Sequence, residues 1–124
     1  MFSHIMIGTN NLERAKAFYD AVLGTLGVQA GFVDGHRVFW RTKTGTFSVS
    51  VPIDGQLATV GNGSTVGFAC ESAAQAAAWH AAGLANGGTA IEDPPGVRGG
   101  TMFLAYLRDP DGNKICGLYR LPKA

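Results

Sequence analysis

The sequence predicts one α+β domain composed of two tandem β-α-β-β-β modules. A chain of 124 residues has the length of a single ordinary domain. The segment that begins at His4 aligns without a gap with the segment that begins at Thr65, 61 positions later, and apolar positions match apolar ones. Each copy opens with a short apolar run and continues with apolar residues at helical spacing. Because two copies are too few for a repeat solenoid, we expect a single domain over residues 1–124, with modules at about 1–57 and about 64–121.

The first module begins with a predicted strand and a predicted amphipathic helix. Residues 2–8 form a short run rich in Ile and Met, which is typical of a strand. Asn10, with Glu13 three positions later, predicts the start of a helix through a capping box. Apolar residues then recur at helical spacing as far as Leu23, and Gly24 is the expected C-cap. This helix would cover one face of a sheet.

Three strands are predicted after this helix, over residues 28–33, 36–41 and 46–51. The turn-forming pairs Asp34-Gly35 and Thr44-Gly45 separate them. Strand alternation divides the side chains between two faces. On the second strand, one face carries His36, Val38 and Trp40, and the other carries Arg37, Phe39 and Arg41. On the third strand, Ser48 and Ser50 point away from the apolar set. Either face of the second strand is a candidate to face a binding site.

The second module repeats this order with a longer loop. Ser72 is the predicted cap of an Ala-rich helix that runs to about residue 85, and strands are predicted over 89–91, 101–108 and 114–119. Residues 109–113 should form a tight turn, because Pro110 presets one dihedral angle and Gly112 accepts a positive one. Residues 52–64 are a Gly-rich surface connection. Residues 94–100, rich in Pro and Gly, are expected to be neither helix nor strand and to move as a flap.

Composition excludes several classes of function. Ten basic and nine acidic residues leave a formal net charge of +1, without a Lys/Arg cluster, so we expect no nucleic-acid partner. No apolar stretch approaches the roughly 20 residues that cross a bilayer. The N-terminus also lacks a basic start, so we expect no membrane partner and a cytoplasmic location. Cys70 and Cys116 are too few for a disulfide scaffold and are expected to be reduced thiols.

Several motifs together resemble the vicinal oxygen chelate superfamily, which includes glyoxalases, bleomycin-resistance proteins and extradiol dioxygenases. The resemblance rests on the paired modules, on His4 at the head of the first strand, on Phe18-Tyr19 before Leu23-Gly24, and on the turn at residues 109–113. It implies an eight-stranded cup-shaped mixed sheet with helices on the outer face. It also implies a homodimer, and a divalent metal held by His and Glu side chains from the first and last strands of each module.

The four ligand positions implied by this resemblance carry only one usual metal ligand. They are His4, its repeat mate Thr65, Cys116 in place of Glu, and Ser48 or Ser50. Hydroxyl groups are weak ligands for a hard or borderline dication, and no carboxylate lies inside a predicted strand. We therefore expect a degenerate metal site and no cofactor, with a divalent metal as the alternative.

Three of the candidate ligand-binding residues have competing interpretations. Trp40 is either an aromatic wall for a planar ligand or part of the core. Arg98, the one charge in its loop, either recognises a carboxylate or phosphate or is a solvated cation. Cys116 is either a nucleophile or a small buried residue.

The leading hypothesis is therefore a protein that binds a small apolar or aromatic molecule in its cup. The first alternative is an enzyme, either a metal-dependent glyoxalase-like lyase or isomerase or a ring-cleaving dioxygenase, in which His4 acts as a ligand or as a general base. The second alternative is a scaffold for a protein partner. The sequence favours no catalytic residue beyond His4 as a candidate.

Overall fold

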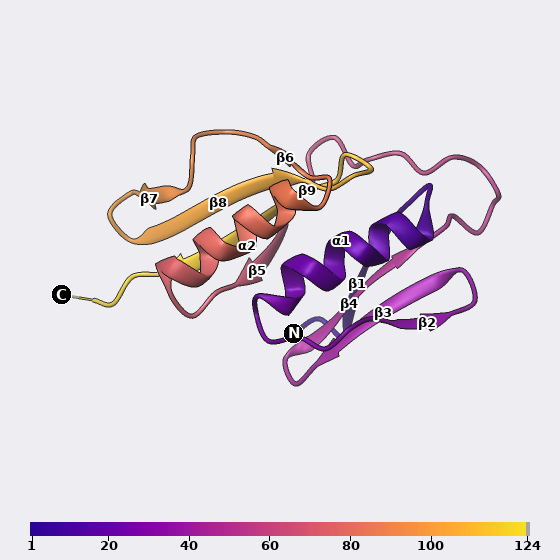
Figure 1. Ribbon diagram of the computed structural model, residues 1–124, viewed down its shortest axis with the longest axis horizontal. Coiled ribbons are helices and arrows are strands. Elements are labelled where there is room, and N and C mark those ends of the chain that lie inside the picture. The colour runs from indigo at the N-terminus through magenta and orange to yellow at the C-terminus, as the bar shows by residue number, and fades with distance from the viewer. Residues whose placement is uncertain (124) are drawn as a thin grey trace.

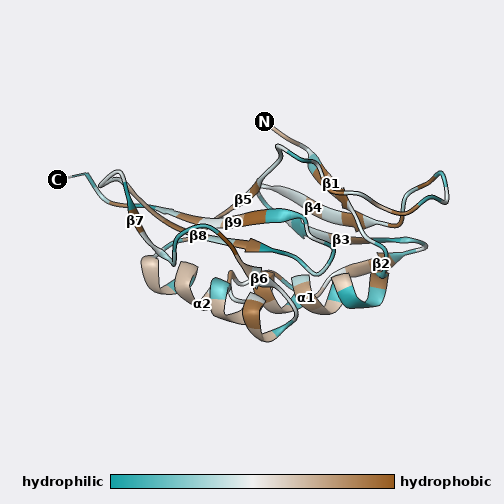
Figure 2. Ribbon diagram, turned by 90° about the horizontal axis from the view of Figure 1, so that it is seen from above, coloured by the Kyte–Doolittle hydropathy of each residue, from teal (hydrophilic) through white to brown (hydrophobic). Residues whose placement is uncertain are grey.

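The computed structural model describes residues 1–123 and has two helices packed on one side of two sheets (Figures 1 and 2). The first module forms a four-stranded sheet, sheet A, in the order β1-β4-β3-β2. Strand β1 runs parallel to β4, and the other pairs are antiparallel. The elements are β1 (His4–Gly8), α1 (Leu12–Gly24), β2 (Phe32–Asp34), β3 (Arg37–Thr42) and β4 (Gly45–Ser50).

The second module forms a five-stranded sheet, sheet B. Its order is β5-β9-β8-β6, with β7 also paired to β8. Strand β5 runs parallel to β9, as β1 runs parallel to β4 in the first module. The elements are β5 (Val66–Ala69), α2 (Ala73–Ala85), β6 (Thr89–Ala90), β7 (Gly96–Arg98), β8 (Met102–Arg108) and β9 (Lys114–Arg120). The α+β class and the repeated module order are thus confirmed.

The sheets differ from the prediction in two places. Residues 94–100 were expected to contain no strand, but Gly96–Arg98 pairs with β8, so the described chain has nine strands in two sheets. The ladder bonds to β8 come from a distant part of the chain, which local composition does not reveal. The strand expected over residues 28–33 begins only at Phe32, because the N–H of Gly31 donates to Asp20 Oδ1 (2.7 Å) instead of to a neighbouring strand.

The helix ends also show where local signals compete. Ser72 caps α2 as predicted, and its hydroxyl accepts from the N–H of Gln75 (3.0 Å). The cap of α1 is Asn11 instead of Asn10. Asn10 is occupied elsewhere: its amide donates to the carbonyl of Ala58 (3.1 Å) and accepts from the N–H of Ala58 (2.7 Å). At the other end, Gly24 is still helical and Thr25 is the C-cap.

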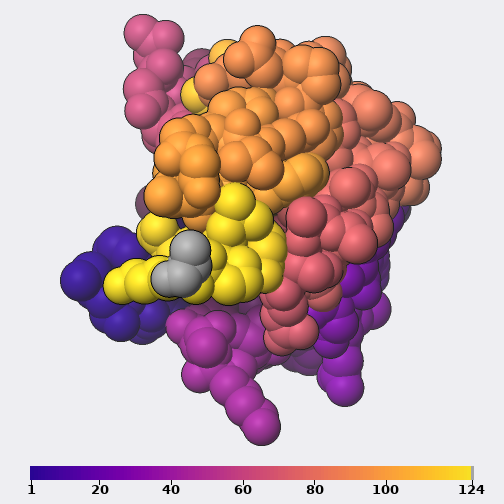
Figure 3. Space-filling model, turned by 90° about the vertical axis from the view of Figure 1, so that its left-hand side faces the viewer, coloured from indigo at the N-terminus to yellow at the C-terminus, as the bar shows by residue number. Residues whose placement is uncertain are grey.

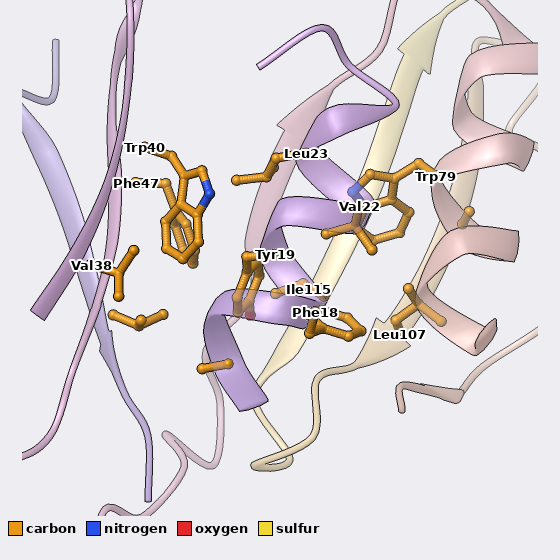
Figure 4. Close-up of a cluster of buried hydrophobic side chains, with 13 residues drawn as sticks. Phe18, Tyr19, Val22, Leu23, Val38, Trp40, Phe47, Trp79, Leu107 and Ile115 are labelled. Carbon is orange, nitrogen blue, oxygen red and sulfur yellow. The ribbon is translucent and has the colours of Figure 1, made fainter. Parts of the chain in front are cut away.

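Helix α1 supplies the centre of the core and contacts both modules. In Figure 4, Tyr19 points toward Trp40 and Phe47 of sheet A, whereas Phe18 lies on the side of Leu107 and Trp79. The Tyr19 ring is 4.7 Å from the ring of Phe47 and 4.9 Å from that of Phe18, centroid to centroid. All of these side chains are buried. Figure 3 shows the two modules packed as one continuous body, with the first residues protruding.

The turn at residues 109–113 ties the second module to the first. The Tyr19 hydroxyl donates to Asp109 Oδ2 (2.6 Å), and the Asn113 amide donates to the carbonyl of Gly8 (3.0 Å). Asp111 accepts from the Thr9 hydroxyl (2.6 Å) and pairs with Arg14 (2.9 Å) at the start of α1. Burial, reinforced by the Asp109 carboxylate, raises the pKa of Tyr19 well above its usual value. Tyr19 therefore stays protonated and donates.

The strand register decides which side chains face the helices. Val38, Trp40, Phe47 and Val49 pair across β3 and β4 and lie in the core. Their neighbours Arg37, Phe39, Arg41, Ser48 and Ser50 must therefore lie on the opposite side, called here the helix-free face. Sheet B has an equivalent side, which carries Tyr106 and Cys116 as a cross-strand pair. Across residues 1–123, neither helix has the length and apolarity of a membrane span.

Candidate functional site

A groove of about 460 Å³ lies where β1 of sheet A meets β5 of sheet B. We call it the seam groove. Both modules, the end of α1 and the exposed N-terminal residues contribute to its walls. Its apolar walls include Ile5, Leu26, Trp40, Phe47, Val66 and Phe68. The groove is therefore formed by segments that are about 60 residues apart in the chain.

Aromatic side chains connect the two modules along this groove. The rings of Phe47 and Phe68 meet edge to face with centroids 5.1 Å apart, and Trp40 lies 5.8 Å from Phe47. Figure 4 shows Trp40 and Phe47 side by side, facing α1. Because aromatic walls present large apolar surfaces with fixed geometry, the groove suits a flat apolar ligand.

Trp40 is held rigidly at the wall of the groove. Its side chain is only 1% exposed, and its indole N–H donates to Asp20 Oδ1 (2.9 Å). Burial alone would raise the pKa of Asp20, but hydrogen bonds from Lys16, Gly31 and Trp40 outweigh it and lower that pKa. Asp20 is thus ionised at neutral pH and keeps Trp40 in place. Trp40 belongs to the core and also lines the groove.

His4 lies at the mouth of the same groove. It is exposed at the start of β1, and its Nδ1 is 2.8 Å from the Ser3 hydroxyl. Imidazole titrates near neutral pH and can accept or donate a hydrogen bond there. His4 is therefore placed to contact the polar end of a ligand whose apolar part enters the groove.

The two predicted serines lie on the helix-free face but are engaged with the backbone. The Ser48 hydroxyl, fully buried, donates to the carbonyl of Ile5 (2.8 Å). The Ser50 hydroxyl donates to the carbonyl of Val51 (2.7 Å). Neither residue lines the seam groove. Their positions confirm the predicted division of faces on β4.

Thr65 and Cys116 lie on the second module. Thr65 is exposed immediately before β5, and Cys116 is 6% exposed on β9, opposite Gly67. Burial raises the pKa of Cys116, and the nearby Lys114 offsets only part of this effect. The thiol is therefore neutral at neutral pH, a form that is a poor nucleophile and a poor metal ligand.

The residues at the four implied ligand positions do not suit a divalent metal. Apart from the His4 imidazole, they offer hydroxyl groups and a protonated thiol. Within residues 1–123, no group of three or more His, Cys, Asp or Glu side chains is arranged to hold an ion. A dication prefers carboxylates, imidazoles or thiolates, so this donor set does not fit one.

Arg98 lies apart from the seam groove. Its guanidinium donates to the carbonyls of Asp93 (3.0 Å) and Pro94 (2.7 Å) in its own loop. The loop is tethered to β8 through the short strand β7. The structure thus brings together His4 and Trp40 at the groove but not Ser48, Ser50, Thr65, Arg98 or Cys116.

Sequence analysis missed several residues of the groove, above all Phe47, Phe68 and Leu26. Phe47 and Phe68 were recognisable as apolar strand positions, but not as neighbours. The repeat alignment places Phe68 opposite Ile7, and no local pattern relates it to Phe47. Leu26 follows a helix and carries no periodic signal. The packing of β1 against β5 is what assembles them.

Comparison with known proteins identifies what this chain is similar to. A family model described as the Glyoxalase/Bleomycin resistance protein/Dioxygenase superfamily matches residues 1–116. The crystal structure of a glyoxalase/bleomycin resistance protein from Albidiferax ferrireducens is 60% identical, with a TM-score of 0.95 over 98% of this chain and 99% of that one. No match is found among curated proteins.

More distant structures share the fold. A glyoxalase-related enzyme from Fulvimarina pelagi is 17% identical, with a TM-score of 0.76 over 96% of this chain and 87% of that one. A lactoylglutathione lyase from Agrobacterium tumefaciens is 19% identical, with a TM-score of 0.68 over 96% and 92%. At these identities the likeness concerns the fold alone.

Proposed function

The chain belongs to the glyoxalase/bleomycin resistance protein/dioxygenase superfamily, and from this premise we propose that it binds a small apolar or aromatic molecule without a metal ion. The observation that carries the proposal is the seam groove. Its volume, about 460 Å³, lies within the range of small-molecule sites, which are mostly apolar with a few polar groups. Trp40, Phe47 and Phe68 supply the apolar walls, and His4 supplies a polar group at the mouth.

The chemistry of the implied ligand positions supports a metal-free site. The Ser48 hydroxyl donates to a carbonyl, and the Cys116 thiol has a raised pKa because it is buried. Deprotonating this thiol to bind a cation would therefore be unfavourable at neutral pH. A degenerate metal site is accordingly part of the proposal, and the metal-dependent enzyme is the alternative that the binding experiment must separate from it.

We also propose that the protein is a homodimer whose second copy closes the cup. Both helices cover the same side of the two sheets, so one chain has no covering layer on the helix-free faces (Figure 2). Apolar side chains lie there, including Met6, Phe39 and Tyr106. Sedimentation equilibrium at micromolar concentration is expected to yield twice the chain mass. A single-chain mass across the whole concentration range would contradict this proposal.

A cytoplasmic location completes the proposal. Cys70 and Cys116 are both free and buried. Thiols that stay unpaired suit a reducing compartment.

Binding to the seam groove is testable with two tryptophan signals. In protein labelled with 5-fluorotryptophan, Trp40 lines the groove whereas Trp79 is buried in the core away from it. A panel of neutral aromatic fragments, such as naphthalene and phenol derivatives, is added in the presence of a chelator. We expect a saturable shift of the Trp40 fluorine signal by at least one fragment, with the Trp79 signal nearly unchanged. The Trp79→Phe variant assigns the two signals.

A matched pair of insertions tests the location. Leu26→Trp adds bulk inside the groove, and Val33→Trp adds the same bulk at an exposed position of β2. We expect the first to weaken fragment binding at least tenfold, about 1.4 kcal/mol, and the second to leave it unchanged. Equal effects of both variants, or no saturable shift with any fragment, would contradict the proposal. Binding that appears only after addition of nickel, zinc, manganese or iron(II) would favour the enzyme instead.

A further inference from the structure

Arg37 carries an unsatisfied hydrogen-bond donor on the helix-free face of sheet A. It is the first residue of β3, and its side chain is half-buried. Its Nε is shielded from solvent and has no hydrogen-bond partner, and Arg37 is in none of the ion pairs of residues 1–123. Buried donors are nearly always paired in native proteins, so an orphaned guanidinium nitrogen calls for an explanation. Arg98, by comparison, has carbonyl partners within its loop.

A second pocket, of about 250 Å³, surrounds this side chain. We call it the Arg37 pocket. Its lining includes Met6, Gly8, Arg37, Ser50, Pro52 and Ile53. It shares no lining residue with the seam groove. Ser50 lies directly opposite Arg37 in the strand register, but its hydroxyl already donates to Val51. The walls are mainly apolar, so Arg37 is the one charged group of this lining.

The charged groups nearby leave Arg37 without a carboxylate partner. Asp34 is its cross-strand neighbour on β2, and no ion pair forms between them among the described residues. Arg41 lies on the same face of β3, and its guanidinium stacks over the rings of Phe32 and Phe39 at 5.6 Å and 4.9 Å. His36 precedes Arg37 and is exposed. This part of the helix-free face therefore has an excess of positive charge.

We propose that the Arg37 pocket binds the carboxylate group of a small organic acid. The Nε and one Nη of a guanidinium present two parallel N–H groups that match the two oxygens of a carboxylate. The apolar walls from Met6 and Ile53 suit the hydrocarbon part of such an acid. A phosphate group is the weaker fit, because this pocket supplies a single cation and no free backbone N–H array.

This site is separate from the seam groove, and its failure would leave the proposed function intact. Because Nε is shielded in the free protein, binding must rotate Arg37 or a neighbouring exposed side chain such as Met6, which is 38% exposed. Displacement of such a side chain is a common adjustment on ligand binding. The site thus predicts a direct change at the Arg37 Nε–H when an acid binds.

The arginine Nε–H signals in a proton–nitrogen correlation spectrum test the proposal. Benzoate and butyrate are the probes, and benzamide and butyramide are their neutral counterparts. We expect both acids to shift the Arg37 Nε–H signal in a saturable way, and the amides to shift it little. R37Q is expected to weaken benzoate binding at least tenfold, and R37K to restore it only in part. R41Q, on the same face and strand, is the matched control and should bind benzoate like the wild type.

Three outcomes would overturn the proposal. The first is an equal response to acids and amides, which would mean that the pocket recognises only the apolar part. The second is an equal loss of binding in R37Q and R41Q, which would indicate a diffuse electrostatic effect. The third is saturable binding of inorganic phosphate without binding of either acid, which would assign the site to phosphate. Urea unfolding of both variants checks that they fold like the wild type.

Discussion

Asp109→Ala is expected to lower the free energy of unfolding by about 3–5 kcal/mol, because it removes a buried charge that accepts four hydrogen bonds. The carboxylate, in a residue 4% exposed, accepts from the Tyr19 hydroxyl (2.6 Å), from the amide side chain of Asn113 (3.0 Å), and from the backbone N–H groups of Asp111 and Asn113 (2.9 Å each). Alanine would leave all of these donors without a partner.

The effect should reach beyond the turn itself. The same turn holds Gly8 through Asn113 and the start of α1 through Asp111. Urea unfolding monitored by circular dichroism measures the change. Asp93→Ala is the control, since Asp93 is an exposed aspartate whose side chain makes no hydrogen bond or ion pair among residues 1–123, and it should change stability by less than about 0.5 kcal/mol. A loss below about 1 kcal/mol in Asp109→Ala would contradict the proposed role of the turn.

The partner substitution Tyr19→Phe has a smaller expected cost and a signature in its pH dependence. Removing one hydrogen bond to a charged group costs about 1.5–3 kcal/mol. Because the pKa of Tyr19 is raised in the folded state, the folded chain keeps this proton at a pH where the unfolded chain loses it. Stability is therefore expected to be fully present below about pH 10, the ordinary pKa of tyrosine, and to fall as the pH rises above it. Tyr19→Phe should fall less steeply there.

Gly83→Val is expected to destabilise the protein by about 3 kcal/mol, because no side chain fits at this point of α2. A Cβ atom at Gly83 would lie 2.2 Å from Leu107 Cδ1 and 3.5 Å from Val22 Cγ1. Leu107 and Val22 are both fully buried in the core and have no space to move into. The helix would have to shift away from β8 and α1.

Gly24→Val is the matched control for this prediction. Gly24 is also helical, but it is exposed, and a Cβ there meets no atom within 4 Å. The same substitution should change stability by less than about 0.5 kcal/mol. Thermal and urea unfolding of the two variants compare them directly. Similar losses at both positions would show that helix propensity, and not close packing at Gly83, accounts for the effect.

Much of the secondary structure follows from local patterns. The helical spacing of apolar residues after Asn11, the Ser72 cap and the turn at residues 109–113 each act within a few residues, and the structure contains all of them. The repeat that begins at His4 and Thr65 likewise predicted the two modules. The predictions that were wrong concern competition for a partner. Asn10 and Asn11 are both suitable caps, and the contact of Asn10 with Ala58 decides between them.

The binding surfaces were less predictable than the fold. Strand alternation separated Arg37 from Trp40, but it did not say which of the two faced the helices. His4 and Trp40 both line the seam groove, as candidates chosen from the sequence, whereas Phe68 and Leu26 had no local signal. Arg98 was the expected anion-binding residue, and its bonds to Asp93 and Pro94 could not be read from a loop rich in Pro and Gly.

The sequence by itself determined the family, the module order and the residue types at the four implied ligand positions, because these depend on neighbours along the chain. Only the tertiary structure decided that both helices cover the same side of the sheets, that Trp40 faces the core while Arg37 faces away, and that β1 and β5 enclose the seam groove. The physical reason is that burial and hydrogen-bond pairing depend on segments that meet across about 60 residues of chain. A periodic pattern records that a strand has two faces, but the packed partner determines which of them is covered.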